Sequence, residues 1–328
     1  MEARSSSGSF STPAPRVASD RLDVWSIVNE AAAISPIQPI VNLGQGFFGF
    51  NPPQFAIDAA KEALNRVDCN QCAPTKGRLS LRKAIASAYS KLLERPIDEE
   101  NEVTITSGAN EGMLCALLAF IHPGDEVVTF EPFFDHHNPV GKVFTETELQ
   151  RIGDFCLKHD LLILSDEVYD HLYYVPFTRI ATISPDLYDH TLTVASAGKA
   201  FHATGWRIGY LIGPQQLIKY VSAVHTRICY SSVSPLQEAV AVAFEAADRN
   251  GFWEHSRQEM KDKMRLFCEV FEDLGLPEIG VAAIPPSEFY SDDNAHIGED
   301  FLRFAFCKED EVLEMGKQRL LRLKSYIV

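Results

Sequence analysis

Long apolar runs and positive charge are what this sequence lacks. No stretch of the 328 residues is apolar enough to cross a bilayer, and residues 1–20 lack the apolar core of a secretory signal. The chain carries 30 Lys and Arg against 45 Asp and Glu, a formal net charge of -15. Because such a charge repels phosphate backbones and anionic lipids, the sequence predicts a protein that binds neither a nucleic acid nor a membrane.

The seven cysteines do not show the spacing of a disulfide framework or of a metal site. Cys69 and Cys72 form a C-x-x-C pair, but no second pair and no histidines at ligand spacing accompany it, so we predict no bound metal. Scattered thiols are typical of a reducing compartment, and we expect a cytoplasmic protein. Residues 1–20 are Ser-rich and hold two arginines, so a mitochondrial presequence is the alternative to a disordered tail there.

What the sequence does contain is an alternation of helical and strand patterns. Apolar residues recur at helical spacing over residues 53–65, 79–94, 111–121 and 146–160. Short apolar runs predict strands over residues 39–43, 101–106, 126–132, 161–167 and 191–196. This alternation predicts an α/β fold with a mainly parallel sheet buried between helices. From about residue 236 the chain reads mostly helical, before a predicted strand at 301–306 and a helix at 309–326.

The first stretch that carries chemistry is TSGANEG, residues 106–112. In open parallel sheets, ligands bind in the crevice beyond the carboxyl ends of the strands. Here a turn at such an end leads into the N-terminus of a predicted helix. Free backbone amides at Gly108, Ala109 and Asn110 would bind a phosphate, although many strand–helix turns look the same.

Two further strand ends supply ionisable groups. SDEVYD, residues 165–170, brings Asp166 and Tyr169 to the crevice, and its alternative interpretation is a helix N-cap with a charged first turn. SAGKAFHATGWR, residues 196–207, brings Ser196, Lys199 and Arg207. A phosphate seat, a strand-end carboxylate and a strand-end lysine together suit pyridoxal phosphate, which needs an amine, a carboxylate for its ring nitrogen and donors for its phosphate.

These motifs resemble those of a known family. SAGKAFHATGWRIGY at 196–210 resembles the lysine segment of fold-type I aminotransferases. The stretches SDEVYD, HNPVGKVFT, VNLGQGF, AAIPPSEFY and FLRFAFCKEDE narrow the resemblance to the kynurenine aminotransferase and glutamine transaminase K group. The resemblance runs in order from about Arg21 to the C-terminus, and it is specific because several motifs agree.

The resemblance implies a fold, a division into domains and an activity. It implies a disordered tail at 1–20, an arm and part of the small domain at 21–46, a large pyridoxal-phosphate domain at 47–235 and a smaller α/β domain at 236–328. The implied enzyme is a homodimer that passes an amino group from kynurenine, glutamine or another bulky amino acid to a 2-oxo acid. A β-lyase side activity on cysteine conjugates is also implied.

The resemblance also implies a role for each cofactor-binding residue. Lys199 would link to the cofactor and move the proton at the substrate α-carbon, and Asp166 would pair with the pyridinium nitrogen. The remaining implied contacts are Tyr169 and Asn138 to the ring's phenolic oxygen, Phe134 (with Phe133 as the alternative) to the ring face, and Ser196, Arg207, Gly108, Ala109 and Asn110 to the phosphate.

The implied substrate site lies at both ends of the chain. Arg303 would bind the substrate α-carboxylate with a two-pronged guanidinium, and Gly46 would leave space for that carboxylate. Trp25 and Tyr230 match positions that line the side-chain pocket, although aromatic residues are more often part of a core. The alternative interpretation of Arg303 is a solvent-exposed strand residue without a role in binding.

Two rival motifs have less support. GQGFFG at residues 44–49 matches the glycine fingerprint of dinucleotide-binding proteins, but FNPP follows where a helix should open. The S-x-x-K from Ser196 to Lys199 matches penicillin-binding serine enzymes, whose companion S-D-N and K-T-G motifs are absent.

The sequence departs from the family at two places. Asp135 is followed almost at once by HNPVGKVF, where relatives continue through further strands and a helix. Parallel strands need a crossover of a dozen or more residues, so at least the strand that should end at Asn138 is missing. A second loss follows EDLGLPEI at 272–279. The alternative to an active enzyme is therefore a shortened, inactive family member that binds or regulates a partner.

Overall fold

The computed structural model describes residues 26, 29–30, 33, 40–134, 138–139, 142–273, 289–291, 293–298 and 301–322. Its centre is a four-stranded sheet in the order β1-β6-β5-β4. The strands are β1 (Val103–Thr106), β4 (Ile163–Asp166), β5 (Thr191–Ser196) and β6 (Gly209–Ile212). β4 and β5 are parallel, and β6 is antiparallel to both β5 and β1. Three strands thus share one direction, which confirms the predicted mainly parallel sheet.

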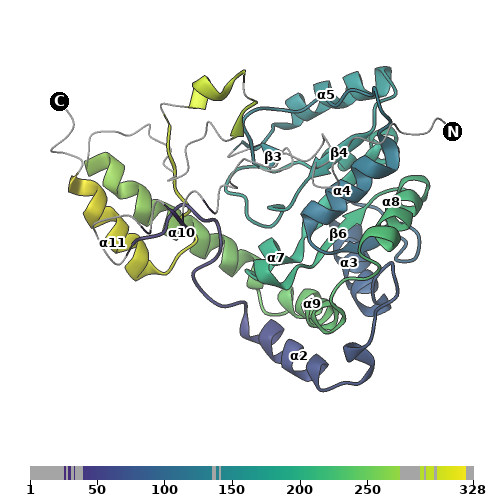
Figure 1. The fold of residues 1–328 in the computed structure, drawn as a ribbon, viewed down its shortest axis with the longest axis horizontal. Coiled ribbons are helices and arrows are strands. Elements are labelled where there is room, and N and C mark those ends of the chain that lie inside the picture. Colours follow the sequence, from purple (N-terminus) through teal and green to yellow (C-terminus); the bar gives the residue numbers. More distant parts are fainter. Residues whose placement is uncertain are drawn as a thin grey trace, which may run out of the picture.

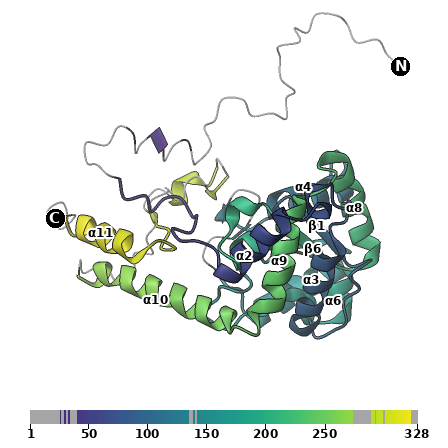
Figure 2. The ribbon, with the colours of Figure 1, turned by 90° about the horizontal axis from the view of Figure 1, so that it is seen from below.

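Helices cover both faces of this sheet. Helices α3 (Leu79–Leu92) and α9 (Ser234–Ala247) pack on one face, in a core that includes Tyr210 and Ile212 of β6. Helices α4 (Ala109–Phe120) and α8 (Gln215–Ile228) pack on the other face, in a core that includes Leu211. Because side chains of a strand alternate between faces, the apolar run of β6 fills both cores. Figure 2 shows β1 and β6 between α4 and α3.

The remaining elements lie around this layered centre. They are α2 (Gln54–Leu64), α5 (Glu146–Lys158), α6 (Pro185–Asp189), α7 (Ala197–Ala200), α10 (Phe252–Asp273) and α11 (Asp310–Leu320), with short 3₁₀ turns at Asp68–Asn70, Ile180–Thr182, Thr204–Trp206 and Ala295–Gly298. Helices α10 and α11 lie side by side at one end of the molecule, apart from the sheet (Figures 1 and 2). No helix in the described part of the chain is long and apolar enough to span a membrane.

The strand predicted over residues 126–132 does not form. Residues 125–130 have no regular secondary structure, and Val127 and Val128 are 54% and 77% exposed. The chain instead turns back through a hairpin of β2 (Phe133–Phe134) and β3 (Asn138–Pro139). A strand needs a neighbour to satisfy its backbone groups, and no described segment pairs with the outer edge of β4.

Two shorter strand predictions also fail within the described residues. Residues 40–43 have no strand, and at 301–306 only Arg303 has strand character. The two segments nevertheless lie together, because the N–H of Ala305 donates to the carbonyl oxygen of Leu43 at 2.5 Å. The N–H of Gly49 likewise donates to the carbonyl oxygen of Cys307 at 2.9 Å. The N-terminal arm is thereby joined to the C-terminal part of the chain.

Candidate active site

The residues predicted to form a phosphate seat lie together at the N-terminus of α4. Gly108 caps this 12-residue helix with a φ of 87°, a conformation that favours glycine. A Cβ atom on Gly108 would lie 2.3 Å from Nη2 of Arg207, so the guanidinium lies directly against the helix start. Gly209 is equally constrained, because its Cβ would lie 2.5 Å from the Ala109 nitrogen. Helix amides and a guanidinium thus meet at one point, which is suited to an anion.

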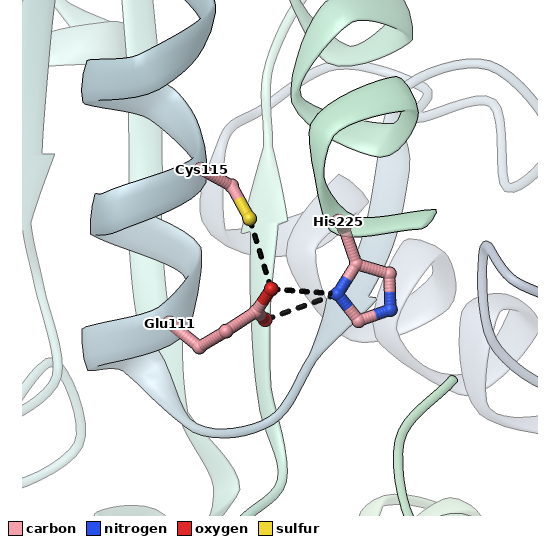
Figure 3. A group of neighbouring side chains, drawn as sticks. All are labelled: Glu111, Cys115 and His225. Atoms are coloured by element: carbon pink, nitrogen blue, oxygen red, sulfur yellow. Dashed lines mark hydrogen bonds and ion pairs between the residues drawn. The ribbon is translucent and has the colours of Figure 1, made fainter. Parts of the chain in front are cut away.

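A buried hydrogen-bonded cluster lies just behind this seat (Figure 3). The Glu111 carboxylate accepts hydrogen bonds from His225 Nδ1 at 2.9 and 3.0 Å, from the Cys115 thiol at 2.9 Å and from the Ser107 backbone N–H at 3.0 Å. Burial raises the pKa of Glu111, but the hydrogen bonds from His225 and Cys115 outweigh it, so the pKa lies below its ordinary value. The cluster therefore ties the first turn of α4 to α8.

The same three side chains place possible metal-ligand atoms within 4.8 Å of one another. The three groups already satisfy one another, because the Cys115 thiol and His225 Nδ1 both bond to the Glu111 carboxylate. Burial and the bond to Glu111 also raise the pKa of Cys115. We therefore interpret the cluster as an anchor for the phosphate seat.

Lys199, Asp166 and Tyr169 come together at the carboxyl ends of β5 and β4. Lys199 lies in α7, directly after β5, and its Nζ is 5.1 Å from the centre of the Tyr169 ring. Burial raises the pKa of Asp166 to about 6, against the opposing effects of the Val168 N–H and the charge of Lys199. The Val168 N–H donates to Asp166 Oδ1 at 3.1 Å. The lysine and the carboxylate predicted from the sequence thus share one site.

A buried ionic network supports this edge of the sheet. Asp170 accepts hydrogen bonds from Tyr89 at 2.7 Å and from Arg179 at 3.0 Å. Arg179 Nε lies 3.4 Å from a carboxylate oxygen of Glu167, and burial raises the pKa of Glu167 to about 7. Glu167 and Asp170 follow Asp166 within four residues, so the network fixes the segment that leads away from it.

The predicted carboxylate-binding pair also meets. A Cβ on Gly46 would lie 3.5 Å from Nη2 of Arg303, so the glycine backbone faces the guanidinium. The guanidinium carbon of Arg303 is 5.4 Å from the centre of the Phe289 ring. Gly46 and Arg303 lie more than 250 positions apart in the sequence, and the pairing of the arm with the C-terminal segment brings them together.

For five other predicted residues the structural evidence is less direct. Phe134 and Asn138 are paired backbone positions of the β2–β3 hairpin, outside the central sheet. Tyr230 is 58% exposed and has a φ of 64°. Trp25 lies outside the described residues. Ser196 ends β5 opposite Gly209, which puts it beside the phosphate seat.

Sequence reasoning missed several residues of this region. His202 packs its ring 4.4 Å from that of Phe48, and burial lowers the pKa of His202 to about 4. Burial raises the pKa of Cys307, although the charges of Lys308, Lys199 and Arg303 act against it. The signal in the sequence was their position inside the motifs themselves, His202 in SAGKAFHATGWR and Cys307 and Lys308 in FLRFAFCKEDE.

Comparison with known proteins agrees with this arrangement. The model for aminotransferase class I and II matches residues 38–137 and 136–291. The chain is 37% identical to the "Probable kynurenine--oxoglutarate transaminase BNA3" of Saccharomyces cerevisiae, with 97% of each chain covered. It is 28% identical to human kynurenine–oxoglutarate transaminase 3, with 94% of this chain and 89% of the human protein covered.

Solved structures give the same result. The crystal structure of Bna3p from Saccharomyces cerevisiae superposes with a TM-score of 0.88, covering 94% of this chain and 97% of that one. N-succinyldiaminopimelate aminotransferase from Mycobacterium tuberculosis, 28% identical, gives a TM-score of 0.82 over 92% of this chain and 97% of that one. The fold is that of fold-type I aminotransferases. The chain belongs to the aminotransferase class I and II family, and its relatives support an enzyme rather than an inactive member.

The alignments also show where this chain is shorter. The alignment with the yeast transaminase spans 433 positions, so at least 105 of them (433 less 328) hold no residue of this chain. The family match divides into two segments that meet at residues 136–137, directly after Asp135. That is the first place where the sequence departs from the family, and where the structure has a hairpin in place of a crossover.

Proposed function

We propose that this aminotransferase uses pyridoxal phosphate to move an amino group from kynurenine or another bulky amino acid to a 2-oxo acid. One observation carries the proposal. Lys199, Asp166 and the start of α4 beside Arg207 all lie at the carboxyl ends of the parallel strands. The choice of kynurenine follows the names of the relatives, and it is the finer part of the proposal.

The described residues fit the phosphate of this cofactor. The N-terminus of α4 offers the amides of Ala109 and Asn110, and a side chain on Gly108 would fill the space beside Arg207. Ser196 would add a hydroxyl from the end of β5. A phosphate dianion would be held by helix amides and one guanidinium, which are favourable partners for it.

The residues around Lys199 fit the ring. When bound, pyridoxal phosphate supplies an aldehyde that takes up the amino group and a ring that withdraws electrons. Lys199 would hold the cofactor and move a proton at the substrate α-carbon, while Asp166 would pair with the ring nitrogen. Tyr169 and Asn138 would bind the phenolic oxygen, and Phe134 would stack on the ring.

The substrate would bind between the arm and the C-terminal segment. Arg303 and Gly46 would hold its carboxylate. Trp25 and Tyr230 would line the side-chain pocket. Because the Tyr230 ring is 58% exposed, it would contribute to the site of a second subunit, so we propose a homodimer. We also propose a cytoplasmic location. The proposed division of the chain is a tail (1–20), an arm (21–46), a large domain (47–235) and a small domain (236–328).

The experiment is a transamination assay on the purified chain with added pyridoxal phosphate, L-kynurenine and 2-oxoglutarate. Glutamate formation is expected from the natural chain, and a loss of at least about 100-fold from Lys199→Ala, because a positioned acid–base group contributes about that much or more. Lys219→Ala removes an exposed lysine of α8 and serves as the matched control. Glutamate formation that survives in Lys199→Ala would contradict the proposal.

A further inference from the structure

Lys308 is a buried cation whose hydrogen bonds among the described residues go to carbonyl oxygens and not to a carboxylate. Its side chain is 3% exposed, and its Nζ donates to the carbonyl oxygens of Gln45 and Phe47, each at 2.8 Å. The same Nζ lies 3.4 Å from the centre of the Phe47 ring. Burial lowers the pKa of Lys308. Because burying an ammonium group in this way is costly, its position calls for a reason.

The two carbonyl groups that Lys308 binds flank Gly46 in the sequence. The carbonyl of Gln45 belongs to the same peptide unit as the N–H of Gly46. In a trans peptide these two bonds point in opposite directions, so the Gly46 N–H points away from Lys308. Within the described part of the chain this N–H donates no hydrogen bond. Among the described residues nothing therefore competes with a ligand for it.

The available N–H lies beside the arginine of the substrate site. The Cβ position of Gly46 is 3.5 Å from Nη2 of Arg303, and Lys308 follows Arg303 by five residues. A hydrogen bond from a charged donor to the Gln45 carbonyl also polarises that peptide, which makes its N–H a better donor. Lys308 thus fixes the direction of the Gly46 N–H beside Arg303 and makes that N–H a stronger hydrogen-bond donor.

Attachment of the arm does not depend on Lys308 alone. Backbone hydrogen bonds from Ala305 to Leu43 and from Gly49 to Cys307 join the two segments on either side of it. A lysine that served only to tie the segments together would duplicate these bonds. What Lys308 adds is a hold on the carbonyl groups of Gln45 and Phe47, which lie between Leu43 and Gly49 in the sequence.

We propose that Lys308 is a positioning residue for the substrate carboxylate. By binding the carbonyl oxygens of Gln45 and Phe47, it fixes the Gly46 amide beside Arg303, so that amide and guanidinium bind one carboxylate together. The inference rests on the proposed function, since it assigns Gly46 and Arg303 to the carboxylate. It extends that function to a residue that does not touch the substrate.

The test compares Lys308→Met, which keeps the apolar stem, with Lys317→Met, which removes a lysine that is paired with Glu269 on the neighbouring helix. Calorimetry with 3-phenylpropionate measures carboxylate binding without turnover, and steady-state kinetics gives KM and kcat for the amino donor. We expect Lys308→Met to weaken 3-phenylpropionate binding and raise KM about 10-fold or more, roughly the worth of one charge-assisted hydrogen bond. kcat and pyridoxal phosphate affinity change less than threefold, and Lys317→Met leaves all four unchanged.

A double variant makes the test independent of folding losses. If Lys308 acts through the site of Arg303, then Lys308→Met and Arg303→Lys together cost less than the product of their separate effects on binding. Lys308→Gln, which keeps a neutral donor, gives an intermediate loss and replaces Lys308→Met if that variant does not fold.

Three results would overturn the inference: unchanged carboxylate binding in Lys308→Met, equal losses in pyridoxal phosphate and carboxylate binding, or no binding of 3-phenylpropionate to the natural chain. A natural chain that binds the carboxylate with a Lys308-dependent affinity but forms no glutamate would instead contradict the proposed function alone.

Discussion

The two lateral sides of the central sheet differ in how deeply their strands are buried: the side formed by β1, β6 and β5 is the packed side, and the side formed by β4 is the open side. Strands β5 and β6 and their neighbour β1 are buried on both faces, and Leu192, Val194 and Leu211 have no exposed surface. β4 forms the other edge and is only half-buried along its length. Val127 and Val128, in the segment predicted as a further strand, are exposed and pair with no strand among the described residues. The β4 side is therefore the open side of the sheet in the described part of the chain.

This difference divides the candidate site as well. Gly108, Lys199 and Arg207 follow or precede the packed strands β1, β5 and β6. Asp166 and Asn138 lie on the open edge and in the hairpin beyond it. The phosphate and lysine end of the site therefore has a rigid support, whereas the ring-nitrogen and phenolic-oxygen end has less. We expect cofactor attachment to be more robust than control of its ring.

Leucine truncation on the two sides should give the largest contrast. Leu211 is fully buried in β6, whereas Leu162, directly before β4, is 38% exposed. Leu211→Ala should lower the free energy of unfolding by about 2–5 kcal/mol, the usual cost of a cavity in a packed core. Leu162→Ala should lower it by about 1 kcal/mol or less. Urea unfolding measures both, and similar losses would mean that the two sides are equally packed.

A methyl group at Gly209 should damage the phosphate seat from within. Its Cβ would lie 2.4 Å from the Gly108 carbonyl carbon, a contact that forces the two backbones apart. We expect Gly209→Ala to cost about 1–3 kcal/mol of stability, as overpacking does, and also to weaken pyridoxal phosphate binding. Gly205→Ala, where the Cβ meets nothing within 4 Å, is the matched control. Unaltered cofactor affinity in Gly209→Ala would place the phosphate elsewhere.

The Asp166 carboxyl should make the cofactor-free protein less stable as pH rises. Burial raises its pKa from 3.8 to about 6, so the folded chain holds this proton more tightly than the unfolded chain does. Its contribution to stability is therefore present below about pH 4 and is lost as pH rises through 6. Asp166→Asn should be more stable than the natural chain by about 3 kcal/mol at pH 7 and nearly equal to it at about pH 3. A gain that is independent of pH would contradict this account.

A charge on the open side should have the smallest effect on stability. Val128 is 77% exposed in a segment without strand partners, so Val128→Lys should change the free energy of unfolding by no more than about 0.5 kcal/mol. It should nevertheless reduce self-association, because lysine beside an unpaired edge opposes edge-to-edge contact. Light scattering at increasing protein concentration measures this. Equal scattering by both proteins would mean that the open side is protected.

Elements that depend on local sequence could be predicted, and those that need a partner could not. The helix at 109–120 follows from its glycine cap and apolar spacing, and β5 from its continuous apolar run. The segment VVTF has an equally good strand pattern, yet it forms no strand and pairs with no described segment. Lys308 reads as a surface charge until the arm is seen folded over it. Gly46 and Arg303 were paired only through the family resemblance.

The central claim is that the packed side of the sheet still assembles a cofactor site at Lys199. Borohydride reduction of the protein incubated with pyridoxal phosphate, followed by peptide mass mapping, tests it most directly. We predict a pyridoxyl group on the peptide that contains Lys199 at one equivalent of cofactor, and the loss of that label in Gly209→Ala at the same concentration. Label spread over exposed lysines such as Lys219, with none preferred, would contradict the claim.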